Sequence, residues 1–192
     1  MPKKKLPVDS NCTKNLVYLD IETTGLSAEK GAKILEIAML KVSDNLEETR
    51  YEKLVNPQRP IAAECSQIHF IYDEMVKDAP AFKDIAAEVL DFIGSNTVVC
   101  HNAKFDLSFV KKEIYEALNL KVDFNYIDTL MMARRHFNFS SNALGAIADT
   151  VGIEVGVRHR AMADVLTMQA VSKYLFKRLM QKGIDEITIG IF

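Results

Sequence analysis

The order of two patterns constrains the fold most: strand-like runs come first, and helical patterns follow. The segments "NLVYLDIE" (15–22) and "AKILEIAMLKV" (32–42) are rich in apolar and β-branched residues, and "EETRYEKLVN" (47–56) alternates more weakly. Short links join these three segments. They therefore predict an antiparallel meander of three strands.

Helical patterns dominate the rest of the chain, with a strand-helix-strand unit among them. A short apolar run at 97–102 precedes a helical pattern over 105–120, and another short strand is expected at 122–128. Other helical patterns cover 81–94, 129–137, 141–152 and 160–183. Because strands come first and helices later, the order predicts a mixed α/β sheet with helices on its faces.

Length and composition predict one compact domain in a reducing compartment. The chain has 192 residues, of which 48% are hydrophobic, and this is enough for a full core. Its three cysteines form no C-x-x-C pair, so neither a disulfide framework nor a cysteine zinc site is favoured. There is no apolar run of the roughly 18 to 20 residues that span a bilayer, and no signal peptide pattern. We therefore expect a cytoplasmic protein without a membrane partner. The net charge of −2 neither indicates nor excludes a polyanionic substrate.

Two acidic residues share one face of the first strand. Side chains alternate along a strand, so Asp20 and Glu22 point the same way as Tyr18. Two carboxylates this close repel each other when buried, which favours a divalent cation or a shared proton between them. The alternative is an edge strand with both acids in water. The Thr-Thr-Gly segment at 23–25 favours a ligand, because turn N–H groups bind phosphates and sugar hydroxyls.

Further polar residues follow strands or open helices. Asp106 stands in the first turn of a predicted helix, where a carboxylate also stabilises the helix dipole. His159 and Asp164 are five residues apart, about 140° around a helix, so both reach one cleft only if His159 lies in the preceding loop. A histidine there suits abstraction of a proton from water near neutral pH. Asp128 is instead predicted to cap the next helix, and Glu36 is interpreted as a strand residue with a supporting role behind the ligands and no chemistry of its own.

Three segments occur in the order of a known family. They are "DIETTGL" (20–26), "HNAKFDLSFV" (101–110) and "HRAMAD" (159–164). Together they resemble the DnaQ-like 3′–5′ exonucleases of the DEDDh type, a group that includes the epsilon proofreading subunit of bacterial DNA polymerase III. One motif is a weak signal, but three in order, with the His-x4-Asp spacing, are specific.

The resemblance implies an α/β protein with a ribonuclease H-like fold. Its five-stranded mixed sheet has three antiparallel strands and two parallel ones, is flanked by helices, and has the Asp20 strand at its centre. We accordingly expect an exonuclease domain over 15–182, a flexible basic tail over 1–14 and a short C-terminal extension over 183–192.

The resemblance also implies roles for the site residues. The ligands of two divalent metal ions, Mg²⁺ or Mn²⁺, are carried over as Asp20, Glu22, Asp106 and Asp164. His159 is carried over as the general base. The residues expected at the substrate are Thr23, Thr24, Gly25, Leu26, His101, Asn102 and Phe105. Phe70 stands where members often have the glycine of His-Gly-Ile, so local contacts are expected to differ there.

The predicted function is that of a metal-dependent 3′–5′ exonuclease. By resemblance it releases nucleoside 5′-monophosphates from single-stranded DNA 3′ ends in proofreading or repair, either free-standing or with a DNA polymerase subunit as partner. Two alternatives stay open: an exoribonuclease that trims RNA 3′ ends, and a module that binds nucleic acid or a polymerase with little turnover. All five catalytic positions are filled, which favours an active enzyme.

Overall fold

The strands and helices follow the predicted order. The computed structural model describes residues 5–8, 13–154, 156 and 159–192. The strands are β1 (Lys5–Pro7), β2 (Leu16–Thr23), β3 (Ile34–Val42), β4 (Glu48–Leu54), β5 (Thr97–Cys100), β6 (Asn125–Asp128), β7 (Glu186–Thr188) and β8 (Gly190–Ile191). The helices are α1 (Ala63–His69), α2 (Asp73–Val76), α3 (Phe82–Ile93), α4 (Ala103–Leu118), α5 (Thr129–His136), α6 (Leu144–Val151) and α7 (Ala161–Gln181).

A six-stranded sheet in the order β4-β3-β2-β5-β6-β8 forms the centre of the fold. The strands β2, β3 and β4 pair antiparallel, while β5 is parallel to β2 and β6 is parallel to β5. The predicted meander and the inner position of β2 are therefore confirmed. The sheet has one strand more than expected, because the two-residue β8 pairs antiparallel with β6. So short a strand leaves no periodic pattern in the sequence.

The two ends of the described chain pair with each other. The strand β1 lies antiparallel to β7, and the side chains of Lys5 and Glu186 form an ion pair across them. We expected a flexible tail over 1–14, but this pairing places residues 5–7 in a strand. Residues 1–4 and 9–12 of that tail lie outside the described residues. The domain boundaries stay a prediction.

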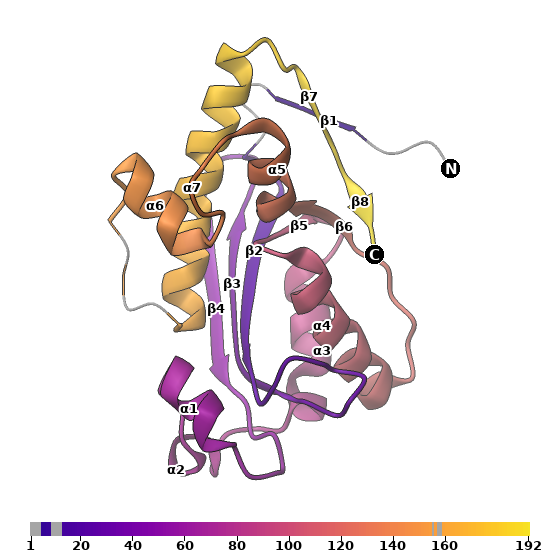
Figure 1. Ribbon diagram of the computed structural model, residues 1–192. Coiled ribbons are helices and arrows are strands. Elements are labelled where there is room, and N and C mark those ends of the chain that lie inside the picture. The colour runs from indigo at the N-terminus through magenta and orange to yellow at the C-terminus, as the bar shows by residue number, and fades with distance from the viewer. Residues whose placement is uncertain (1–4, 9–12, 155, 157–158) are drawn as a thin grey trace.

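Helices cover both faces of the sheet (Figure 1). One face packs against α5, α6 and α7, in a core that includes Leu16, Tyr18 and Leu40. The other face packs against α3 and α4, in a core that includes Val17 and Leu19. Neighbouring residues of β2 thus belong to different cores, as the alternation of side chains along a strand requires. Because both faces are covered, β2 and β3 are nearly continuous apolar runs.

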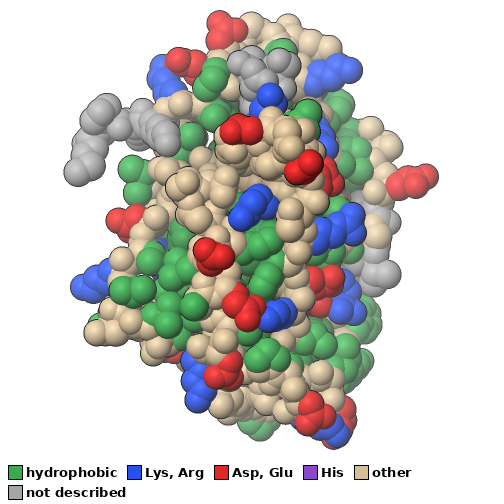
Figure 2. Space-filling view, turned by 180° about the vertical axis from the view of Figure 1, so that it is seen from behind, with side chains coloured by type: hydrophobic (Ala, Val, Ile, Leu, Met, Phe, Trp, Pro, Cys, Tyr) green, Lys and Arg blue, Asp and Glu red, His purple; other side chains and the backbone are tan. Residues whose placement is uncertain are grey.

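Charges of both signs are interspersed on the face of the molecule shown in Figure 2. This agrees with the nearly balanced totals of 24 Lys+Arg and 26 Asp+Glu. Overall charge therefore does not mark this face as a surface for a polyanion. Within the part of the chain that the structure describes, none of the helices has the length and apolar character needed to cross a membrane.

Candidate active site

The second half of β2 carries Asp20 and Glu22 on the face that packs against α7. They continue the row of Tyr18, which lies in the α7 core. Glu22 lies opposite Glu36 of β3, and the register shifts directly after this pair. Both carboxylates of β2 are partly buried. Since β2 is an inner strand, the alternative of two acids on a sheet edge in water is excluded.

Asp106 lies in the first turn of α4, and a side chain from β6 fixes where that helix begins. The carboxylate of Asp128 accepts hydrogen bonds from the N–H groups of Asn102 (3.3 Å) and Ala103 (3.1 Å). It also accepts one from the N–H of Met131 (3.1 Å), in the first turn of α5. The prediction that Asp128 caps α5 is confirmed, and the same carboxylate caps α4 as well.

The third segment brings His159 and Asp164 to Glu22. The helix α7 begins at Ala161, so His159 lies in the preceding loop, as the spacing required. Glu22, His159 and Asp164 each offer one ligand atom within 4.8 Å of the others. The backbone N–H of His159 also donates to the Asp164 carboxylate (3.0 Å). A strand, a loop and a helix thus contribute to one cluster.

The acids of this site disfavour one another's charged forms. Burial raises the pKa of Asp20 well above its ordinary value, and the charges of Asp106 and Glu22 raise it further. Burial, with the charge of Asp164, raises the pKa of Glu22 to about 8. Burial also raises the pKa of Asp106. Perturbation of this kind is typical of functional sites.

The donor set fits a divalent cation. Carboxylate oxygens are the ligands that Mg²⁺ and Mn²⁺ prefer, and Glu22 and Asp164 offer them beside the His159 ring. A bound cation would offset the electrostatic repulsion between these carboxylates. The chemistry of the donors therefore fits a divalent cation, and the identity and number of the ions stay predictions.

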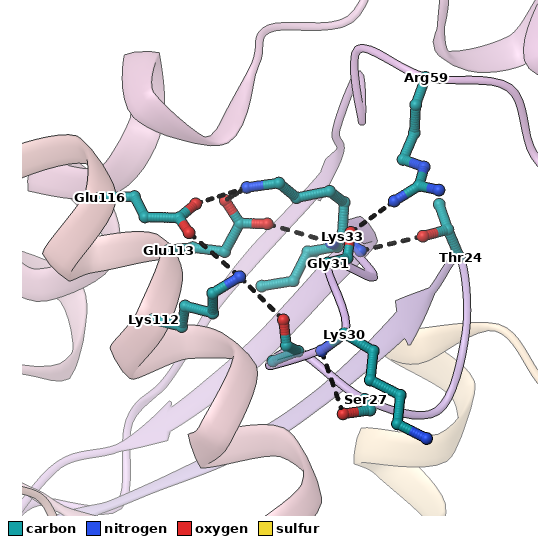
Figure 3. A network of polar contacts seen from close by, with 11 residues as sticks. Thr24, Ser27, Lys30, Gly31, Lys33, Arg59, Lys112, Glu113 and Glu116 are labelled. Carbon is teal, nitrogen blue, oxygen red and sulfur yellow. Dashed lines mark hydrogen bonds and ion pairs between the residues drawn. The ribbon is translucent and has the colours of Figure 1, made fainter.

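The turn after β2 is fixed by its own hydrogen bonds (Figure 3). The Thr24 N–H donates to the Lys33 carbonyl (2.9 Å), and the Thr24 hydroxyl accepts from the Lys33 N–H (2.9 Å). The Thr23 hydroxyl donates to the Gly25 carbonyl (2.7 Å). Leu26, which follows, is 90% exposed. A defined turn thus presents Leu26 to solvent, and its contact with a substrate stays a prediction.

Cations from two other segments hold the 24–33 loop (Figure 3). Lys112 of α4 donates to the Ala28 carbonyl (2.8 Å). Arg59 donates to the Gly31 carbonyl (2.6 Å). The two carbonyls belong to different parts of the loop. These contacts therefore restrict movement of the whole loop relative to the rest of the protein.

Beside this loop, acids of α4 form ion pairs with a lysine (Figure 3). The Lys33 ammonium lies 3.1 Å from the Glu113 carboxylate and 2.6 Å from that of Glu116. Burial raises the pKa of Glu113, and Lys33 opposes this rise. Here the protein supplies positive charge through Lys33.

The substrate residues predicted in the second motif differ in their accessibility. The His101 ring has partners at both nitrogens: the Thr129 hydroxyl at Nδ1 (2.9 Å) and the Asn142 carbonyl at Nε2 (2.8 Å). A hydrogen bond between a substrate and either ring nitrogen would have to replace one of them. Asn102 is exposed, with φ 83°, and Phe105 packs partly buried against the core of α3 and α4.

Two buried polar residues lie near the site, and the sequence assigned no chemistry to either. Glu36 is 1% exposed, and its carboxylate accepts hydrogen bonds from Arg160 and the Ala161 N–H. His69 is 2% exposed, its Nδ1 accepts from the Ile71 N–H (3.1 Å), and burial lowers the pKa of its ring. The signal available for Glu36 was a single acid inside an apolar strand.

Phe70 keeps the backbone conformation that glycine adopts easily. It ends α1 with φ 56° and ψ 26°, and its N–H donates to the Ser66 carbonyl (2.9 Å). Its side chain is 54% exposed. The left-handed turn after α1 is thus retained, at a cost of about 1–2 kcal/mol that glycine avoids.

Comparisons with known sequences agree with this geometry. The family model described as exonuclease (RNase_T) matches residues 17–171. The chain is 35% identical to DNA polymerase III subunit epsilon of Rickettsia prowazekii over 162 residues, which cover 81% of this chain and 71% of that protein. It is 32% identical to the PolC-type DNA polymerase III of Caldanaerobacter subterraneus over 90% of this chain, but this is only 12% of that protein.

Solved structures with the same fold are nucleases. A structure of exonuclease X in complex with 5′ overhanging duplex DNA matches with a TM-score of 0.67 and 28% identity, over 88% of this chain and 93% of that one. The nuclease domain of 3′hExo, a DEDDh family member bound to rAMP, matches with a TM-score of 0.71 and 18% identity, over 90% and 94%. The ribonuclease H-like fold expected from the sequence is confirmed.

Proposed function

The chain belongs to the DnaQ-like 3′–5′ exonucleases of the DEDDh type, and we propose that it shortens single-stranded DNA from the 3′ end, releasing nucleoside 5′-monophosphates. The observation that carries this proposal is the convergence of acids from β2, α4 and α7 with His159 beside them. The similarity to a polymerase III epsilon subunit supports a proofreading or repair role, with a DNA polymerase subunit as partner.

In this proposal, the metal ligands are Asp20, Glu22, Asp106 and Asp164. These four carboxylates would hold two divalent ions, Mg²⁺ or Mn²⁺, which when bound would supply positive charge at the scissile phosphate and the attacking water. The exposed His159 accepts the proton of the attacking water. Because these residues surround the end of β2, the reacting phosphate lies over that strand.

The turn after β2 orients the end of the substrate. The segment at 23–25 contacts the terminal 3′-OH, and the exposed Leu26 packs against the terminal base. Contacts of this kind read no base sequence. The proposal therefore predicts a preference for a free single-stranded 3′ end of any sequence.

The product ladder of a 5′-labelled single-stranded DNA oligonucleotide tests this proposal. With Mg²⁺ or Mn²⁺ we expect stepwise shortening from the 3′ end, and EDTA or Asp20→Ala should abolish it. Glu48→Gln, a change in a strand acid that contacts α7 at Gln169, is the matched control and should leave the ladder unchanged. DNA that stays intact with either metal would contradict the proposal.

RNA is the second candidate substrate, because the same fold occurs in a nuclease domain bound to rAMP. An RNA oligonucleotide of matched sequence in the same assay distinguishes the two. Much faster degradation of RNA would replace the DNA proposal with trimming of RNA 3′ ends. Tight binding of either strand without metal-dependent hydrolysis would indicate a binding module instead.

A further inference from the structure

An ion pair joins the buried Glu36 to the partly exposed Arg160, the residue that follows His159 in the chain. Glu36 of β3 receives both Nε (3.2 Å to each carboxylate oxygen) and Nη2 (2.7 Å) of Arg160. The same carboxylate accepts from the Ala161 N–H (2.9 Å). Glu36 therefore binds one side chain and one backbone group of two consecutive residues, the two that join the His159 loop to α7.

We propose that Glu36 and Arg160 are positioning residues, which form a clamp that holds His159 toward the acids of β2. This inference rests on the proposed function, in which His159 accepts the proton of the attacking water. Neither residue of the clamp needs to touch the substrate. Its effect passes through the backbone from Arg160 to the adjacent His159.

The backbone at His159 supports this role. His159 has φ 60°, in the left-handed region that costs a residue other than glycine free energy. Two contacts hold this conformation: the His159 N–H donates to the Asp164 carboxylate, and the next residue is bound to Glu36. A strained conformation persists when the surrounding structure determines it from more than one side.

The chemistry of the pair suits positioning more than general stability. The guanidinium is a planar fork that binds a carboxylate through two atoms in one orientation, whereas an ammonium lacks this geometry. Glu36 is the direct neighbour of Glu22 in the antiparallel register. The clamp therefore fixes the position of His159 relative to the strand pair β2–β3, which carries Glu22. A ligand atom of Glu22 lies within 4.8 Å of a ligand atom of His159.

Steady-state kinetics of Glu36→Gln tests the clamp. Because a displacement of about 1 Å in a reacting group costs about 10²-fold, we expect kcat to fall about 10- to 100-fold while KM stays within about twofold. In a His159→Ala background the same substitution should change kcat by less than about twofold. Glu48→Gln, which removes the charge from another contact between a strand acid and α7, should leave kcat unchanged in both backgrounds.

A second variant guards against a fold defect. Arg160→Lys keeps the charge but removes the fork, so it should lower kcat in the same direction. Wild-type kcat in Arg160→Lys, or an equal fall for Glu36→Gln with and without His159, would overturn the clamp.

Imidazole NMR signals test the clamp without activity. The chain has four histidines, so His101 and His136 serve as internal references. The clamp predicts that Glu36→Gln shifts or broadens the His159 signal while those two stay in place. An unchanged His159 signal would overturn it. A wild-type protein that degrades neither DNA nor RNA would instead reject the proposed function, and the NMR result would still decide on the clamp.

Discussion

Two buried acids of the same helix have opposite surroundings. Asp106, in the first turn of α4, is 3% exposed, and Glu113, two turns later, is 7% exposed. Asp106 faces further acids, and its charge raises the pKa of Asp20. Glu113 instead accepts a hydrogen bond from Lys33. Burial raises the pKa of Glu113, and the positive charge of Lys33 opposes this rise. Burial alone thus does not identify a functional acid; among the described residues, other acids raise the pKa of Asp106, whereas Lys33 lowers that of Glu113.

The largest expected effect is that of Asp20→Asn, a change of nearly equal size. We expect kcat to fall at least about 10⁴-fold, because metal ligands and base act as one unit. The metal-free variant should be more stable than wild type, since one member of a repelling group becomes neutral. Single-turnover hydrolysis and thermal unfolding in EDTA measure the two effects. Near-normal hydrolysis by this variant would contradict the inference that the acids around Asp20 are functional whereas Glu113 is structural.

His159→Ala should have the next largest effect. General-base catalysis contributes typically about 10²- to 10⁴-fold, so kcat should fall within that range. Binding of Mn²⁺, measured by calorimetry, should largely persist because the carboxylates remain. Loss of metal binding together with activity would show that His159 belongs to the ligand set rather than serving as the base.

The pH dependence of stability should also separate the two groups. An acid whose folded-state pKa is raised contributes stability that is complete below its unfolded value and is lost as pH rises through the folded value. The pKa of Glu22 rises from 4.5 to about 8, so the metal-free protein should lose stability across this interval. We expect the midpoint of thermal unfolding to fall by at least about 3 °C, and Mg²⁺ to reverse the loss at pH 8. A midpoint that is independent of pH in EDTA would contradict the repulsion inferred at β2.

The smallest expected effect is that of Glu113→Gln. Removing one charge of a partly buried pair should lower the free energy of unfolding by about 1–3 kcal/mol, with kcat nearly unchanged. Urea unfolding measures the loss. Glu116→Gln is the matched control, because Glu116 is more exposed and its pair with Lys33 should contribute less than about 1 kcal/mol. A large loss of activity in Glu113→Gln would mean that the loop network supports catalysis directly.

The sequence predicted what depends on local pattern. Alternation along β2 correctly placed Asp20 and Glu22 on one face, and the spacing of His159 and Asp164 correctly required a loop before α7. The sequence did not reveal the contact of Glu36 with Arg160, because 124 residues separate them and nothing in either segment indicates that the two residues pair. The sequence also did not predict that Phe70 keeps the left-handed backbone of the glycine it replaces, since a bulky residue does not favour that conformation.

The shared cap at Asp128 has a consequence for cooperativity. Its carboxylate binds the first turns of both α4 and α5, so neither helix can unravel from its start without loosening the other. Asp106 stands in one of those turns. The helix α5 contributes none of the proposed ligands. Its local opening would nevertheless release Asp106, a proposed ligand in the first turn of α4. Hydrogen exchange should consequently report α4 and α5 as one opening unit, whose closed population sets the fraction of molecules with a complete site.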